Sequence, residues 1–246
     1  MVPGSVPLIM LEDALRYPWQ GENHVETILI GGVLTLLGVL LVPLLFVCGY
    51  LVRVIRLVSA GADDLPPVFE DWWDLLVEGF VAFAIGLAYL LVPATVVALA
   101  VVSFVVPVSV VEGPTSVAGP TDPSTGGAVL TLLVVLVVLG LIVGAVYLLP
   151  AAIAAYAVTG RAGAAFSPST LWAVGGDGSY AVALLIAVLI GVVAQLVAGV
   201  VTATVIGALL IPLVTFYGNV ASAYAIGTGV RDTALRGDDR DDAVAS

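Results

Sequence analysis

The sequence predicts an all-α integral membrane protein, a polytopic bundle of about five transmembrane helices, and two observations carry that prediction. Hydrophobic residues make up 61% of the 246 residues and charged residues only 10%, whereas soluble domains are about half apolar and a quarter charged. The apolar residues also lie in long runs without a charge, and about 20 of them suffice for a helix to cross a bilayer. These figures exclude both a soluble globular domain and a disordered chain.

Four charge-free blocks define the spans. They contain 26, 33, 33 and 53 residues and run over 27–52, 79–111, 128–160 and 178–230. Each of the first three suits one span, and the fourth suits two spans with a turn near 202–207. The expected spans, with flanking residues, are 27–58, 79–108, 128–158, 180–203 and 206–230. A sixth span arises in an alternative in which residues 25–58 form a short hairpin broken near Pro43.

The segments outside the spans have different expected roles. Residues 1–24 form an N-terminal interfacial segment, and Met10 opens its amphipathic stretch LEDALRYPW. Residues 1–9 are therefore interpreted as an extension upstream of the natural start. Residues 231–246 alternate Asp and Arg, and we expect this acidic tail to be disordered.

The charges predict a source and an orientation. Eighteen acidic residues against seven arginines, with no lysine, give a net charge of −11. This composition suits a cytoplasm at multimolar salt, where the Debye length is about 3 Å, so we expect a haloarchaeal cell membrane; a GC-rich bacterium is the alternative. The excess of negative charge argues against a nucleic-acid partner. Arginines follow the first, third and last spans, and because positive residues favour the cytoplasmic side, this predicts a cytoplasmic C-terminus. With five spans Arg16 lies on the outer side, against this rule, whereas six spans place it inside.

The most distinctive segment outside the spans is both aromatic and acidic. Phe69, Trp72 and Trp73 recur at helical spacing, and Asp71 and Asp74 occupy the rest of the helix surface. This pattern predicts a short amphipathic helix over 69–78 that lies in the interface, with its indoles at headgroup depth. The segment is the candidate surface for membrane lipids or protein partners.

The carboxylates of the same region allow a second interpretation. Residues 63–64 add two aspartates upstream, and oxygen ligands suit calcium or magnesium. No EF-hand spacing is present, however, and a solvated acidic face is the commoner outcome. We therefore expect no metal and no other cofactor.

The spans themselves contain few polar groups. Gln195 and Asn219 are costly against lipid, so we expect them to face other helices; the alternative is a polar lining for a small solute. Gly140 and Gly144 form a GxxxG pattern that permits close helix packing within the fold or between copies. No ionisable residue lies near the middle of a span, which argues against coupled transport. No serine elbow, HExxH or CxxC motif occurs, so we expect no enzyme activity.

Three runs of residues carry a resemblance to a known family. They are Leu15–Pro18, the span end from Pro43 through Gly49 and Tyr50 to Arg53 and Arg56, and the stretch from Pro67 through Phe69–Trp72 and Leu75 to Glu78 and Gly79. Together they resemble haloarchaeal multi-pass membrane proteins grouped as domain of unknown function 4013. The resemblance implies a helical membrane domain and a haloarchaeal source, and it implies no activity and no catalytic residue.

The expected function is that of a non-enzymatic membrane module. Such a module organises lipids, protein partners or further copies of itself through the segment over 69–78. The alternative is a permease or channel component for a small neutral or apolar solute, which would use Gln195 and Asn219.

Overall fold

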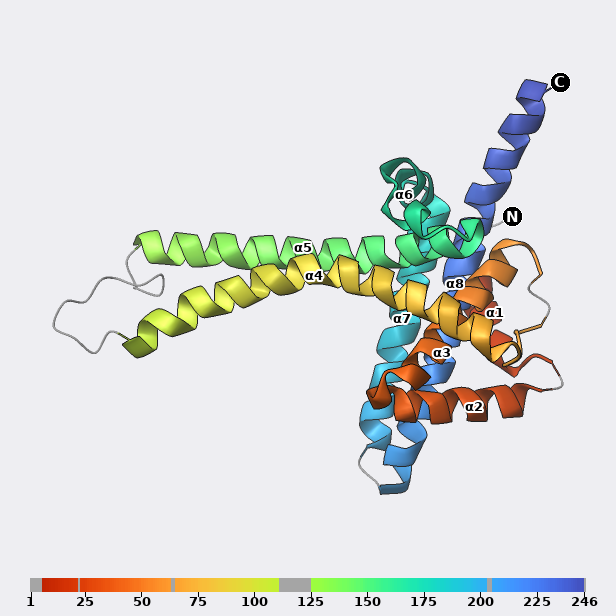
Figure 1. Cartoon of the computed structure of the whole chain (residues 1–246), viewed down its shortest axis with the longest axis horizontal. Coiled ribbons are helices and arrows are strands. Elements are labelled where there is room, and N and C mark those ends of the chain that lie inside the picture. Colours follow the sequence, from red (N-terminus) through yellow and green to blue (C-terminus); the bar gives the residue numbers. More distant parts are fainter. Residues whose placement is uncertain (1–5, 22, 63–64, 111–124, 203–204, 246) are drawn as a thin grey trace. The chain divides into compact units, whose positions relative to one another are not determined.

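The computed structural model describes residues 6–21, 23–62, 65–110, 125–202 and 205–245. Every regular element in those ranges is a helix (Figure 1), so the all-α prediction is confirmed. Five helical stretches are long and apolar enough to cross a membrane, as the charge-free blocks predict. They are Val42–Ser59, Trp72–Ala100, Thr131–Thr159, Gly178–Val201 and Leu210–Arg231.

The elements follow one another in this order: α1 Val6–Arg16, η1 Tyr17–Trp19, α2 His24–Leu36, η2 Leu37–Leu40, α3 Val42–Ser59, α4 Trp72–Val110, α5 Thr125–Thr159, η3 Ala162–Phe166, α6 Pro168–Gly175, α7 Gly178–Val201 and α8 Val205–Ala245. The chain divides into two compact units. The first comprises Met1–Ile85 and Pro150–Ser246, and the second comprises Gly86–Leu149, so that α4 and α5 contribute to both. The second unit presents many exposed apolar side chains, among them Leu99, Leu132 and Val143.

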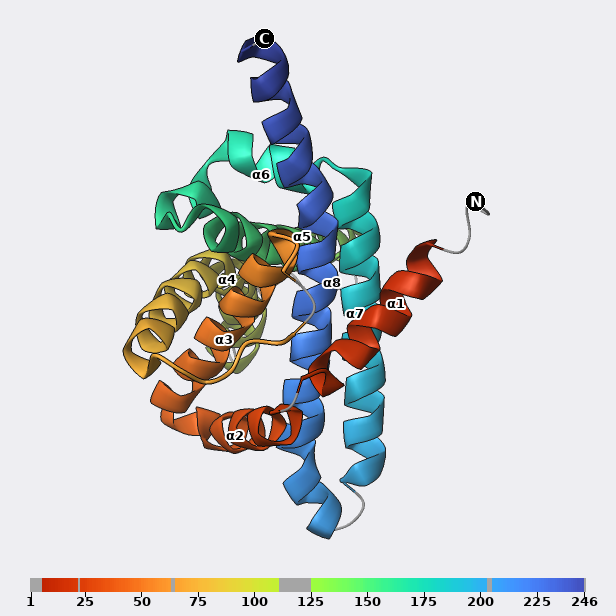
Figure 2. The same cartoon turned by 90° about the vertical axis from the view of Figure 1, so that its right-hand side faces the viewer.

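The core of the first unit is the antiparallel pair of α7 and α8, which lie side by side (Figure 2). Glycines of α8 allow the approach. A Cβ added at Gly218 would lie 2.8 Å from the Cβ of Ala194 in α7, and one added at Gly227 would lie 2.8 Å from the Cβ of Val58 in α3. Because no side chain intervenes, α8 packs directly against α7 on one side and α3 on the other.

The first hydrophobic block is not the continuous span expected over 27–58. It is divided into α2, η2 and α3, and Leu41 between them has a φ of +63°, which a straight helix does not allow. Pro43 follows in the first turn of α3, where its missing N–H costs no helical bond. The chain therefore turns near Pro43, as the hairpin alternative predicts. However, α2 has 13 residues and a length of about 20 Å, which is short for a crossing.

The N-terminal helices are held against α8. In both views α2 runs crosswise to α8 (Figures 1 and 2), and Gly32 meets Leu213 there, 2.5 Å from an added Cβ. Tyr17 of η1 is fully buried, and its ring centroid lies 4.5 Å from that of Tyr224. These contacts make the N-terminal segment part of the packed unit.

The acidic tail is helical as far as the structure describes it. α8 continues to Ala245, whereas the sequence predicts a disordered tail over 231–246; that disorder stays a prediction. No proline follows Pro212 in the sequence, so no residue of the tail excludes a helix in the way that proline does.

Candidate functional site

The candidate site forms where α3 and α4 cross at two glycines. A Cβ at Gly79 would overlap the carbonyl oxygen of Leu45, and one at Gly49 would overlap that of Leu75. No residue other than glycine fits at either position while the two backbones stay this close. The crossing therefore fixes the start of α4 against the first half of α3.

The residues before α4 set where that helix begins. Pro66 and Pro67 disfavour a helix in the approach to α4, which is the segment over residues 65–71. Asp71 has a φ of +52°, a conformation that Asp tolerates better than most residues, and its carbonyl accepts the first helical bond from the Leu75 N–H at 3.0 Å. The short interfacial helix expected over 69–78 is therefore wrong: α4 begins at Trp72 and the same helix continues through its span.

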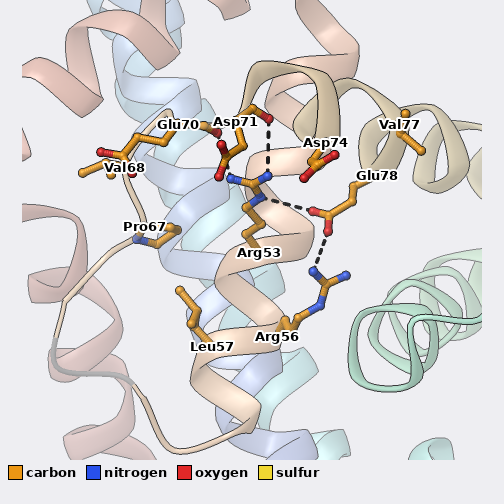
Figure 3. A pocket seen from close by; sticks show the side chains of 10 residues that line it. All are labelled: Arg53, Arg56, Leu57, Pro67, Val68, Glu70, Asp71, Asp74, Val77 and Glu78. Atoms are coloured by element: carbon orange, nitrogen blue, oxygen red, sulfur yellow. Dashed lines mark hydrogen bonds and ion pairs between the residues drawn. The ribbon is translucent and has the colours of Figure 1, made fainter.

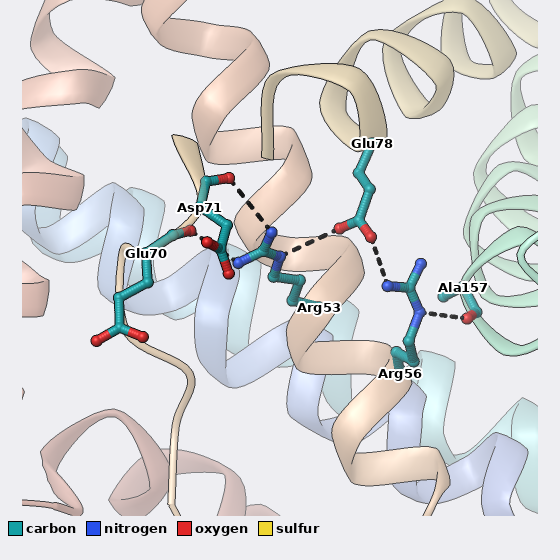
Figure 4. Close-up of polar contacts among 6 residues, drawn as sticks. All are labelled: Arg53, Arg56, Glu70, Asp71, Glu78 and Ala157. Carbon is teal, nitrogen blue, oxygen red and sulfur yellow. Dashed lines mark hydrogen bonds and ion pairs between the residues drawn. The ribbon is translucent and has the colours of Figure 1, made fainter. Parts of the chain in front are cut away.

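Two arginines one turn apart on α3 converge on a single carboxylate of α4 (Figure 4). Arg53 Nε donates to Glu78 Oε2 at 3.3 Å, and Arg56 Nη1 donates to Glu78 Oε1 at 2.5 Å. Arg53 and Glu78 are each 18% exposed, and Arg56 is 38% exposed. Partial shielding from water makes this ion pair network stronger than a surface pair.

The same arginines also bind backbone carbonyls. Arg53 Nη1 donates to Glu70 O at 2.9 Å and Nη2 donates to Asp71 O at 3.5 Å. Arg56 Nε donates to Ala157 O, in the last turn of α5, at 2.9 Å. The carbonyls of a last helical turn lack helical partners, and a positive charge there is favourable. Arg53 and Arg56 therefore join α3, the approach to α4 and the end of α5.

A third arginine closes the same end of the unit. Arg231 of α8 donates from Nε and Nη2 to Val58 O, at 3.0 and 2.8 Å. Val58 lies in the last turn of α3, and its carbonyl also accepts from the Gly61 N–H at 3.1 Å, so Arg231 adds a positive charge where a helix end favours one. Arginines that the sequence places after the first and last spans are thus neighbours in the structure.

A cavity of about 550 Å³ lies beside this network (Figure 3). Its lining consists of Arg53, Arg56, Leu57, Pro67, Val68, Glu70, Asp71, Asp74, Val77 and Glu78. Two guanidinium groups face four carboxylates, so the lining carries a net charge of −2. Glu78 holds both arginines, whereas no ion pair within the described ranges engages the side chains of Glu70, Asp71 and Asp74.

The aromatic residues of the predicted segment divide into two groups. Phe69 is buried and stacks on Tyr50, with ring centroids 4.6 Å apart, so it anchors the approach to α4 in the core. Trp72 and Trp73 are exposed at the start of α4, Trp73 by 73%. Of the five residues predicted for partner binding, the two tryptophans are therefore at the surface, Asp71 and Asp74 line the cavity, and Phe69 is interior.

The acidic residues do not form a metal centre in the described part of the chain. No group of three or more His, Cys, Asp or Glu side chains there is placed to hold a metal ion. Residues 63–64, which the cation interpretation needs, lie outside the described residues.

The two amides of the spans, Gln195 in α7 and Asn219 in α8, are both exposed. Neither makes a hydrogen bond to any residue that the structure describes, so the expected contacts with other helices are not found there. Ala194 and Gly218 make the contact between α7 and α8, and the next residue of each helix is turned away by about 100°. The hollow that Gln195 lines is open and formed by α7 alone.

The GxxxG pattern of the third span is also uncovered. Nothing in the described part of the chain lies within 4 Å of a Cβ added at Gly140 or Gly144. The close helix contact that this motif predicts occurs instead at Gly49 and Gly79, which are not spaced as a motif within one helix.

Sequence reasoning missed the arginine network and the glycine crossing. Arg53 and Arg56 are three residues apart and share a helix face, which was an available signal. Glu78 and Gly79 adjoin in the sequence, and all four residues lie within the runs that carry the family resemblance. Their pairing across 25 and 22 residues was not visible in any local pattern.

Comparison with known proteins identifies a family and no characterised relative. A family model described as a protein of unknown function, DUF4013, matches residues 33–203. The matched region contains the whole cavity lining and both glycines of the α3–α4 crossing. No curated protein and no solved structure matches the chain.

Proposed function

Because the chain belongs to the DUF4013 family of proteins of unknown function, we propose its role from the site alone: a non-enzymatic membrane module that docks a basic protein segment in the α3–α4 cavity. The observation that carries the proposal is the cavity itself, with a net charge of −2 and exposed Trp72 and Trp73 beside it. Its lining includes no Ser, Thr, Cys or His side chain, which is why we assign it to binding.

The charge arrangement favours a cationic ligand over an anionic one. Arg53 and Arg56 already share the carboxylate of Glu78, so an anion would have to compete with a bound intramolecular partner. Glu70 and Asp74 are exposed, and both are available to Lys or Arg side chains. The adjacent tryptophans supply apolar area and cation–π faces for the same ligand.

Binding of a short arginine-rich peptide to the full-length protein in detergent tests the proposal. The double substitution Glu70→Gln with Asp74→Asn removes two charges from the lining and no backbone contact, so we expect the affinity to fall about fivefold to tenfold. A matched variant, Asp13→Asn with Glu26→Gln, removes two charges elsewhere and should bind as the wild type does. Equal affinities for all three proteins would overturn the proposal, as would binding only to vesicles of an amine-bearing lipid.

The tryptophans provide a second test of the same role. Trp72→Ala with Trp73→Ala removes the exposed aromatic surface beside the cavity, and we expect weaker peptide binding with intact membrane insertion. If neither insertion nor peptide affinity changed, the exposed start of α4 would have no part in docking.

We also propose a haloarchaeal cell membrane as the location, with the arginine-rich end in the cytoplasm. The support is the lysine-free acidic composition and the meeting of Arg53, Arg56 and Arg231 at one end of the first unit. Labelling of a cysteine placed near the C-terminus tests the orientation in intact cells. Labelling by a membrane-impermeant reagent only after lysis is expected, and labelling before lysis would reverse the orientation.

A further inference from the structure

We propose that two copies of this chain associate in the membrane through one flank of the α7–α8 pair, where Gln195 of each copy hydrogen-bonds Asn219 of the other. This proposal concerns a surface separate from the α3–α4 cavity. It rests on the placement of two amides that have no partner among the described residues.

The helix geometry puts both amides on the same flank. Ala194 of α7 meets Gly218 of α8 at the contact between the helices, so Gln195 and Asn219 are each one residue beyond that contact. A step of one residue turns a side chain by about 100°. Seen from one end, this turn is clockwise in one antiparallel helix and anticlockwise in the other, so both side chains point to the same side at the same depth.

That depth is within the hydrocarbon region. Asn219 precedes Arg231 by 12 residues, which is about 18 Å along α8. Arg231 binds the end of α3 with its guanidinium and marks the polar end of the unit. Because the hydrocarbon core is about 30 Å thick, both amides lie near its middle, where lipid offers no hydrogen bond and an unpaired polar group is costly.

The chemistry of the two side chains suits a second copy of the same chain. A carboxamide both donates and accepts hydrogen bonds, so Gln and Asn pair with each other without a charge. In a dimer with its two-fold axis along the membrane normal, equal depths coincide, and Gln195 meets Asn219 twice. A partner with an ionised group at this depth would bring a larger cost of its own.

The surface around the amides is open enough for a close approach. Gly191 and Gly199 lie one turn before and after Gln195, and nothing within the described ranges lies within 4 Å of a Cβ added at either. A hollow of about 450 Å³ follows the same part of α7, lined by Val188, Gly191, Val192, Gln195 and Leu196. Small residues flanking a polar one are typical of helix interfaces in membranes.

The test is energy transfer between two fluorescently labelled populations of the full-length protein in liposomes, measured over a range of protein-to-lipid ratios. We expect the wild type to dimerise. Gln195→Leu with Asn219→Leu should raise the dissociation constant at least about tenfold, because two to four interhelical hydrogen bonds are lost. The exchange variant Gln195→Asn with Asn219→Gln keeps the donors and acceptors and should dimerise like the wild type.

Two further variants separate association from folding. Gly191→Leu should weaken dimerisation while leaving thermal unfolding of the dilute protein unchanged, because the added side chain meets open space. Val193→Leu, which places the same side chain on an exposed residue of α7 away from this flank, should have no effect on association. A wild type that stays monomeric at every ratio would overturn the proposal, and so would a double leucine variant that dimerises as tightly as the wild type.

Discussion

The α3–α4 crossing and the outer flank of the α7–α8 pair are built from the same kinds of residue, and their environments are opposite. At the crossing, Gly49 and Gly79 press two backbones together, and the nearby arginines are bonded to Glu78 and to carbonyls. On the flank, glycines face open space and amides have no partner within the described ranges. Glycine spacing and polar residues within a span therefore do not show whether a helix face is already packed against another helix of the same chain. The residues that lie opposite that face show it.

Gly79→Ala should have the largest effect of any single change in this comparison. The added Cβ would overlap the carbonyl oxygen of Leu45, and a helix backbone cannot yield as a side chain can. We expect a loss of about 4 kcal/mol or more, or no folded protein at all, measured as thermal unfolding in detergent. Gly199→Ala is the matched change on the open flank and should be neutral or stabilising by up to about 1 kcal/mol. Similar losses in both variants would refute the contrast.

The sequence was sufficient for the membrane fold and for most of the spans. Runs without charges predicted a turn between residues 202 and 207, and α7 ends at Val201 while α8 begins at Val205. The break between η2 and α3 was harder to predict, because leucine does not favour the positive φ that Leu41 has there. Contacts of α2 with α8, such as Gly32 against Leu213, join residues far apart in the sequence, and no local pattern predicts them.

The candidate site was predictable in its location and not in its construction. The aromatic and acidic character of residues 69–78 singled out a segment of which Glu70, Asp71, Asp74, Val77 and Glu78 line the cavity, and its role in binding stays a prediction. The side chains that build the cavity wall are brought there by distant contacts, such as that of Arg56 with Ala157, 101 residues away. Helical spacing also placed Phe69 on one face of an interfacial helix with Trp72 and Trp73, whereas α4 begins only at Trp72 and the Phe69 ring stacks on Tyr50.

Glu78→Gln should cause the second-largest loss, because it leaves Arg53 and Arg56 without their shared negative charge. A fully buried pair that loses one partner costs about 3–5 kcal/mol, and the partial exposure here reduces the expectation to about 2–3 kcal/mol. Thermal unfolding in detergent measures the change. Glu12→Gln is the matched control: its pair with Arg16 is 60% and 73% exposed, and its loss should cost less than about 0.5 kcal/mol. Equal effects would mean that the α3–α4 network is no more than a surface pair.

Tyr50→Phe tests a polar group beside the α3–α4 crossing that has no hydrogen-bond partner among the described residues. The Tyr50 hydroxyl is buried and has no hydrogen-bond partner among the described residues. Its removal should raise the free energy of unfolding by about 1 kcal/mol, because the cost of burying it disappears while the ring still stacks on Phe69. Tyr217→Phe provides the contrast, since the Tyr217 hydroxyl donates to Leu15 O, and its loss should be destabilising by a similar amount. A drop in stability for Tyr50→Phe would reveal a partner for this hydroxyl.

Gln195→Leu should have the smallest effect on the isolated chain and the clearest effect on its association. In dilute detergent we expect thermal unfolding to change by no more than about 0.5 kcal/mol, as for other exposed positions without partners. Arg53→Leu is the same replacement at the α3–α4 crossing. It should lower the free energy of unfolding by much more, because it removes the hydrogen bonds that Arg53 donates to Glu78 and to the carbonyl of Glu70. If Gln195→Leu lowered the free energy of unfolding by more than about 1 kcal/mol, the Gln195 amide would already have a partner within a single chain. The flank would then be packed within the chain, as the α3–α4 crossing is.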